Sequence, residues 1–113
     1  GCKYLKKYIL QDYRLTFRSE LRVADIEFKE GSSVQGALYE ITEKDESCLD
    51  KYEDFPILYK KIFFKHEGRN VMAYSMENKT PFKYPSTRYL NIIKQGYKDC
   101  DLDSNFLIEA LKG

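Results

Sequence analysis

Apolar side chains occupy every second position in two segments near the start of the chain, residues 13–17 and residues 24–28. Successive side chains of an extended chain point to opposite faces, so this alternation predicts two half-buried strands. The triplet Gly31-Ser32-Ser33 then predicts a turn. Residues 34–41 are apolar on both faces, which predicts a third strand in a central position.

Two small residues, Gly36 and Ala37, lie inside this third predicted strand. A glycine within a strand suits a place where another group approaches the backbone closely. A bulge or an ordinary packing contact explains the same residue equally well. Gly36 is therefore a candidate for contact with a ligand, with packing as the alternative.

A short helix is predicted next, because Thr42-Glu43-Lys44-Asp45 resembles a capping box and apolar residues at positions 48, 49, 52 and 55 form one stripe. Pro56 disfavours helical geometry at Phe55, so the helix should end at or just before that residue. Glu53 then lies in the last helical turn. The partial negative charge of a helix C-terminus disfavours a carboxylate, which predicts a raised pKa for Glu53.

Two more strands are predicted at residues 59–66 and 71–76, on either side of a tight turn. A long connection follows, of the kind that often carries binding residues. Residues 89–97 then show one apolar helical face, and Asp103-Ser104-Asn105 can cap a last helix. Strands first and helices later predict a single α+β domain over residues 1–113, with helices covering one end.

Composition and charge argue against several classes of function. The 113 residues are 42% apolar, which suffices for one folded domain. The net charge is only +1, with basic and acidic residues interleaved, so we expect no nucleic-acid partner. No apolar run approaches the ~18 residues of a membrane span, and no signal-peptide pattern is present. We therefore expect no membrane association.

The cysteines and acidic residues give no support for a metal site. Cys2, Cys48 and Cys100 are odd in number and widely spaced, which argues against a disulfide framework and against zinc. Buried free thiols in a reducing compartment are expected instead, which predicts a cytoplasmic protein. Residues 99–105 alternate like calcium ligands, but Ser104 and Ala110 stand where that loop needs Gly and Glu. Helix capping explains this segment better.

With no metal and no cofactor expected, the remaining chemistry is proton transfer by a carboxylate. The composition permits this chemistry without demonstrating it. Residue types and spacing alone do not select Glu53 from the 18 acidic residues of the chain. A solvated acid at a helix end is the ordinary interpretation of such a residue.

Five motifs occur in a characteristic order: Val34-Gln35-Gly36-Ala37-Leu38-Tyr39, Leu49-Asp50-Lys51-Tyr52-Glu53, Tyr59, Ala73-Tyr74 and Pro85-Ser86-Thr87-Arg88-Tyr89. Together they resemble the γ-glutamylcyclotransferase-like family, which includes the AIG2-like proteins. No single motif is specific, but the ordered set covers nearly all of the chain.

This resemblance implies a small mixed β-barrel of about five to seven strands flanked by short helices, with a cavity at one end. It implies that Glu53 is the catalytic general acid/base, and that Tyr59, Tyr74, Tyr89 and Gly36 belong to the substrate site. The implied activity is release of 5-oxoproline from a γ-glutamyl-amino acid or γ-glutamylamine, without a metal or organic cofactor. The oligomeric state stays open, with a homodimer as one option.

One departure from the family concerns its opening strand and Y-G-S-N loop, whose backbone N–H groups hold the substrate. This sequence has no matching segment, so an upstream part not given, a fragment and a loss of catalysis are all open. Two alternatives to an enzyme follow. One is a non-catalytic AIG2-like domain that binds a small amino-acid-like molecule or a protein. The other is a β-barrel domain with a tyrosine-rich interface.

Overall fold

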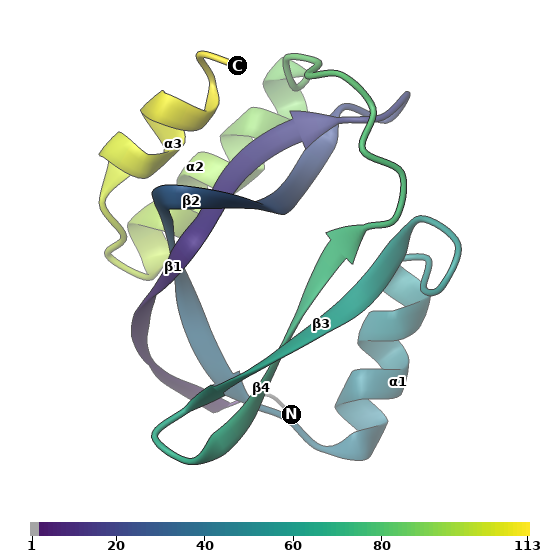
Figure 1. The fold of residues 1–113 in the computed structure, drawn as a ribbon, viewed down its shortest axis with the longest axis vertical. Coiled ribbons are helices and arrows are strands. Elements are labelled where there is room, and N and C mark those ends of the chain that lie inside the picture. The colour runs from purple at the N-terminus through teal and green to yellow at the C-terminus, as the bar shows by residue number, and fades with distance from the viewer. Residues whose placement is uncertain (1–2) are drawn as a thin grey trace.

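Two β-hairpins and three helices make up the fold of residues 3–113, the part of the chain that the computed structural model describes. Along the chain they are β1 (Lys3–Arg18), β2 (Val23–Glu40), α1 (Glu43–Tyr52), β3 (Tyr59–His66), β4 (Arg69–Met76), α2 (Thr87–Asp99) and α3 (Ser104–Ala110). Figure 1 shows α2 and α3 on one side of the molecule and α1 on the other side, next to β3. The predicted α+β class is confirmed.

β1 and β2 form one long antiparallel hairpin whose chain reversal lies at residues 19–22. The predicted turn at residues 31–33 is wrong, because these residues lie inside β2 and stay next to β1. A register shift beside Asp12 marks a β-bulge, and Asp12 Oδ1 accepts a hydrogen bond from Gly31 N at 3.0 Å. Gly31 has a φ of +84°, which a glycine adopts readily. Long-range strand pairing therefore overrides the local turn signal.

β3 and β4 form the second hairpin, with its turn at Glu67 and Gly68, as the sequence predicted. Among the described residues, each strand has a ladder partner only within its own hairpin. A closed barrel needs a partner on both sides of every strand. The predicted mixed barrel of about five to seven strands is therefore not confirmed, since residues 3–113 contain two separate two-stranded sheets.

The predicted capping box begins α1. Thr42 Oγ1 accepts from Asp45 N at 3.1 Å, and the Asp45 carboxylate accepts from Thr42 N at 2.9 Å. The helix ends at Tyr52 with Glu53 as its C-cap, which confirms the predicted end. The predicted apolar stripe is not buried, however, since Tyr52 is 84% exposed. Polar contacts hold α1 instead, with Lys61 of β3 lying 2.6 Å from Glu46 and 3.0 Å from Asp50.

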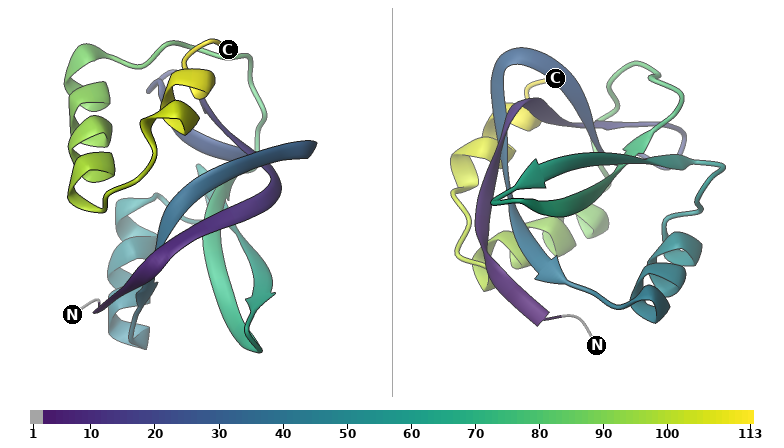
Figure 2. Two further views of the ribbon diagram at one scale, coloured as in Figure 1. Left: turned by 90° about the vertical axis from the view of Figure 1, so that its left-hand side faces the viewer. Right: turned by 60° about the horizontal axis from the view of Figure 1, so that its bottom comes forward.

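A small apolar core lies where the end of β1 meets α2 and α3 (Figure 2). Phe17 has no exposed surface and packs with Leu90 of α2 and with Leu107 and Ala110 of α3. Burial of each large apolar side chain contributes about 1.5–3 kcal/mol to stability. This core fixes α2 against the hairpin of β1 and β2.

None of the helices in residues 3–113 is long and apolar enough to cross a membrane. Cys48 and Cys100 are free thiols, but the first is exposed and the second is half-buried. The prediction that these thiols are buried is therefore wrong for Cys48, which lies on the outward face of α1. Cys2 lies outside the described residues.

Candidate active site

Two of the predicted site tyrosines meet at the backbone of one residue, Ala24 of β2. Tyr59, at the start of β3, donates its hydroxyl hydrogen to Ala24 O at 2.5 Å. Tyr89, in the first turn of α2, accepts a hydrogen bond from Ala24 N at 3.1 Å. The position of Tyr89 follows from the N-cap, because Ser86 Oγ accepts from Tyr89 N at 3.2 Å and starts the helix there. Three elements thus converge on one backbone position.

The third predicted tyrosine, Tyr74 of β4, lies beside the first. The ring centroids of Tyr59 and Tyr74 are 6.4 Å apart, in an edge-to-face arrangement. The Tyr74 hydroxyl donates to Asp50 Oδ1 at 2.6 Å, and Asp50 also pairs with Lys61 at 3.0 Å. The bond from Tyr74, together with Lys61, holds the pKa of Asp50 below its ordinary value.

Glu53 occupies the position just after α1 and is half-buried. Burial raises the pKa of its carboxyl group, in the direction that the helix-end position predicted. Burial also raises the pKa of Tyr59 and of Tyr89, and the charge of Glu53 raises both further. The pKa of Tyr74 is raised by burial, by the bond to Asp50 and by the charge of Glu53. The charge of Glu53 thus acts on all three tyrosines.

The three hydroxyl groups differ in whether their hydrogen atom is already used. Tyr59 donates to Ala24 O, and Tyr74 donates to the Asp50 carboxylate. Tyr89 only accepts, from Ala24 N, and residues 3–113 provide no acceptor for its own hydrogen. A phenol can donate and accept at the same time. Tyr89 is therefore the one of the three that can donate a hydrogen bond to a bound molecule without losing a partner.

Among the residues that the structure describes, Gly36 has no hydrogen bond or ring contact to the three tyrosines. It lines an apolar cavity of about 410 Å³ between the two hairpins and α2, and Ala24 lines the same cavity. A Cβ atom placed on Gly36 would meet nothing within 4 Å, so the space where a side chain would stand is open. The structure thus brings Tyr59, Tyr74 and Tyr89 together, and places Gly36 in the lining of the cavity.

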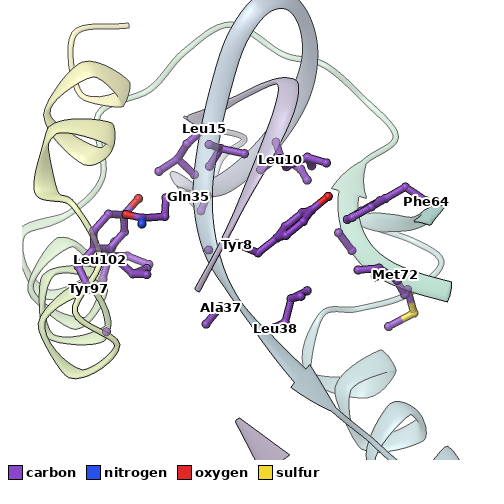
Figure 3. A pocket seen from close by; sticks show the side chains of 18 of the residues that line it. Tyr8, Leu10, Leu15, Gln35, Ala37, Leu38, Phe64, Met72, Tyr97 and Leu102 are labelled. Atoms are coloured by element: carbon purple, nitrogen blue, oxygen red, sulfur yellow. The ribbon is translucent and has the colours of Figure 1, made fainter. Parts of the chain in front are cut away.

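Side chains from both hairpins and from α2 line the apolar cavity (Figure 3). Tyr8 of β1 points across it toward Phe64 of β3, and their rings stack with centroids 5.9 Å apart. Five consecutive residues of β2, 34–38, and three consecutive residues of β4, 71–73, line the cavity. Alternate residues of a strand would line it if only a face were turned inward. Consecutive residues of both strands therefore border this apolar space.

Sequence reasoning missed the residues that position the tyrosines. The alternation in residues 24–28 assigns Asp25 to the polar face, and solvent was the expected surrounding. The side chain of Asp25 has instead no exposed surface and pairs with Arg18 and Lys79. A period of two does not distinguish a solvated acid from a buried and paired one, so no sequence signal was available. Within residues 3–113, no three His, Cys, Asp or Glu side chains are grouped to hold a metal ion.

Replacing Glu53 by Gln is expected to raise the melting temperature at pH 8 and to change it little at pH 4. Burial raises the pKa of Glu53 above its ordinary value of 4.5, so folding disfavours the charged form. This cost is present above the folded-state pKa and disappears as pH falls below 4.5, where both states hold the proton. Glutamine removes the cost. Because the group is only half-buried, we expect a rise of about 1–4 °C.

Thermal unfolding followed by circular dichroism at the two pH values measures this effect. A variant that melts below the wild type at pH 8 would contradict an unfavourable burial of the Glu53 carboxylate. Equal stabilisation at both pH values would point to a cause other than charge.

This chain matches one protein family and several solved structures. A family described as "Gamma-glutamyl cyclotransferase, AIG2-like" matches residues 2–96 of the chain. No curated protein matches significantly. Among solved structures, the human protein loc79017 is 25% identical, with a TM-score of 0.74, and the match covers 100% of this chain and 75% of that one.

Two further solved structures share the fold. One is named gamma-glutamyl cyclotransferase, with 24% identity, a TM-score of 0.74, and a match over 100% of this chain and 75% of that chain. The other is YkqA from Bacillus subtilis, with 22% identity and a TM-score of 0.80, where the match covers 98% of this chain and 45% of that chain.

Proposed function

Because this chain belongs to the γ-glutamyl cyclotransferase, AIG2-like family, we propose that it releases 5-oxoproline from a γ-glutamyl compound, with Glu53 as the general acid/base. The observation that carries this proposal is a half-buried carboxylate with a raised pKa, whose charge acts on three tyrosines from β3, β4 and α2. A carboxyl group in such a place can change its protonation state closer to neutral pH than a solvated one.

The reaction needs little from the protein besides proton transfer and positioning. The α-amine of the γ-glutamyl group attacks its own γ-carbonyl carbon, so a C–N bond forms within the substrate and closes a five-membered ring. The bond from that carbon to the leaving nitrogen breaks. One proton moves from the attacking amine to the leaving nitrogen, and no water is consumed. The nucleophile is already tethered, which gives a high effective molarity.

Glu53 is suited to carry that proton in both directions. As a carboxylate it accepts the proton from the attacking amine, and as a carboxylic acid it gives the proton to the departing nitrogen. Burial favours the protonated intermediate form, since it raises the pKa of Glu53. A solvated acid with an ordinary pKa would be a weaker base at the start of this cycle.

The tyrosines have different roles in this proposal. Tyr89 supplies a hydrogen-bond donor for the substrate, because its hydroxyl hydrogen is not used within residues 3–113. Tyr59 and Tyr74 already donate to protein acceptors, so we assign them no hydrogen bond to the substrate. Gly36 lines the apolar cavity together with Ala24, and its contact with substrate stays a prediction.

The closed barrel of the family belongs to the same proposal and requires at least one further strand. The apolar cavity between the two hairpins is the candidate place for it, since residues 34–38 of β2 and 71–73 of β4 border this space. Such a strand would join the two sheets. In the family that the sequence resembles, it leads into a Y-G-S-N loop that holds the substrate. Loss of one such donor commonly costs about 10²-fold in rate.

The test is a substrate panel with the full-length protein. We expect 5-oxoproline and free amine in equal amounts from γ-glutamyl-amino acids or γ-glutamylamines, measured by mass spectrometry. The α-glutamyl isomers are the matched control, because their amide lies at the other carboxyl group and cyclisation would release no amine. If no γ-glutamyl compound yields 5-oxoproline, the proposal is wrong and a non-catalytic binding domain becomes the better interpretation.

A further inference from the structure

A buried cluster of charged and polar groups connects the two hairpins. We call it the Asp25 joint and define it by Arg18, Asp25, Ser75, Met76 and Lys79. The side chain of Asp25 has no exposed surface and that of Arg18 is 5% exposed. Charged side chains are almost never buried to this degree unless they are paired. The contacts of these groups therefore have to be specific.

The contacts run from β2 to β4 and to the connection after it. Asp25 Oδ1 accepts from the backbone N of Met76 at 2.7 Å. Asp25 Oδ2 lies 2.9 Å from Lys79 Nζ, and 3.1 Å from Arg18 Nε without the alignment of a hydrogen bond. Ser75 Oγ donates to the backbone oxygen of residue 26 at 2.6 Å and accepts from Lys79 Nζ at 2.7 Å.

These bonds have an unusual importance because the backbones of β2 and β4 share no ladder in the described part of the chain. The side chains of the joint hold the two strands in register where backbone pairing does not. Arg18 extends the joint, since its Nη1 donates to Thr80 O at 2.9 Å and so fixes the start of the connection that leads to α2.

The joint lies one residue from the point where both tyrosines attach. Ala24 precedes Asp25, and its N and O atoms bond the hydroxyl groups of Tyr89 and Tyr59. A shift of the Asp25 backbone would therefore move the partners of both hydroxyl groups. Displacements of about 1 Å at a catalytic site can cost about 10²-fold in rate.

We infer that Asp25 is a positioning residue of the candidate site: it fixes the backbone of Ala24 to β4 and thereby sets the places of the Tyr59 and Tyr89 hydroxyl groups. Asp25 does not touch the substrate in this arrangement and acts through the two tyrosines. The consequence for turnover rests on the proposed function, but the geometric part does not depend on it.

The first experiment needs no substrate. The protein is labelled with ¹³C at the ζ carbon of tyrosine, and Tyr59→Phe and Tyr89→Phe identify the two signals. In Asp25→Asn we expect the Tyr89 signal to shift, because its partner Ala24 has moved. Tyr89 is the diagnostic residue, since the charge of Asp25 acts directly on Tyr59. Asp101→Asn is the matched control, as it breaks an ion pair whose carboxylate is 95% exposed. An unchanged Tyr89 signal in a folded Asp25→Asn protein would overturn the inference.

The second experiment is a double-mutant cycle on kcat/KM. Tyr89→Phe should lower kcat/KM by roughly tenfold, the effect of one lost hydrogen bond. Asp25→Asn should lower it at least as much, and the double variant should lose little more than the larger single loss, because Asp25 acts through Tyr89. If the loss of kcat/KM in the double variant equals the product of the two single losses, Asp25 only supports the fold and the positioning role is wrong.

If Asp25→Asn does not fold, a variant at a more exposed residue of the joint tests the same inference. Lys79→Gln removes one cation of the joint from a side chain that is 34% exposed, and should shift the Tyr89 signal as well. Lys83→Gln, from the exposed pair with Glu20, is its control. If the wild type turns over no substrate while the Tyr89 signal shifts as expected, the proposed function is wrong and the geometric part of the inference, that Asp25 positions the tyrosine hydroxyl groups, is supported. If the wild type turns over a γ-glutamyl substrate but the Tyr89 signal does not shift in the variants, the proposed function stays and the positioning role of Asp25 is wrong.

Discussion

Glu53→Gln is expected to lower kcat for 5-oxoproline release by roughly 10²–10⁴-fold, the range of general acid–base catalysis. Glutamine keeps the size and the hydrogen-bonding capacity of the side chain but cannot take a proton from the attacking amine. KM should change little, because the substrate contacts of the neighbouring tyrosines remain. Steady-state kinetics on the best γ-glutamyl substrate of the panel measure both constants.

Asp54→Asn is the matched control for this variant. Asp54 is the next residue, is exposed, and contributes only its backbone atoms to the described hydrogen bonds. It should retain wild-type kcat. If Glu53→Gln turns over as fast as the wild type, Glu53 is not the acid/base and the mechanism is wrong. Since the same variant should be more stable at pH 8, loss of activity could not be ascribed to unfolding.

Phe17→Ala is expected to destabilise the fold by about 3–5 kcal/mol, the usual cost of truncating a fully buried phenylalanine. Phe17 has no exposed surface and holds together β1, α2 and α3. Its ring also lies edge-on to Tyr89, with centroids 6.4 Å apart. The cavity left behind would loosen the helix that carries Tyr89. Urea unfolding followed by circular dichroism gives the change in the free energy of unfolding.

Phe63→Ala, on the outer side of β3, is the control for the loss of a ring in a strand. Phe63 is 69% exposed, and its truncation should cost less than about 1 kcal/mol. Equal losses for the two variants would show that Phe17 is not the centre of the core. A loss below about 1 kcal/mol for Phe17→Ala would have the same meaning.

Helices and turns whose ends are set by residues close in sequence could be predicted from the sequence. The capping box at Thr42 starts α1, and the sequence Phe55-Pro56 agrees with its end at Tyr52. Asp103 begins α3 by accepting from Asn105 N at 2.9 Å, as its residue type suggested. Caps and tight turns satisfy backbone groups within about four residues, so their signals remain readable in a single sequence.

The candidate site was predictable only in part. The position of Glu53 at the end of α1 followed from the local pattern. The predicted direction of its pKa shift is confirmed, but burial causes the shift and not the helix end on which the prediction rested. Its selection among 18 acids came from the resemblance to a family. Tyr59, Tyr74 and Tyr89 were predicted in the same way. Gly36 lines an apolar cavity, and its place in the substrate site stays a prediction, because a glycine in a strand looks the same in the sequence beside a cavity and beside a ligand.

The sequence by itself determined where α1, α2, α3, β3 and β4 form, because caps, turns and apolar periodicity act over a few residues. Only the tertiary structure decided that residues 31–33 continue β2, that Asp25 is buried, and that Tyr59 and Tyr89 meet at Ala24. These outcomes depend on contacts between residues from 7 positions apart, as for Arg18 and Asp25, to 65 positions apart, as for Ala24 and Tyr89. Pairing and burial at such separations compete with local preference, and here they prevailed.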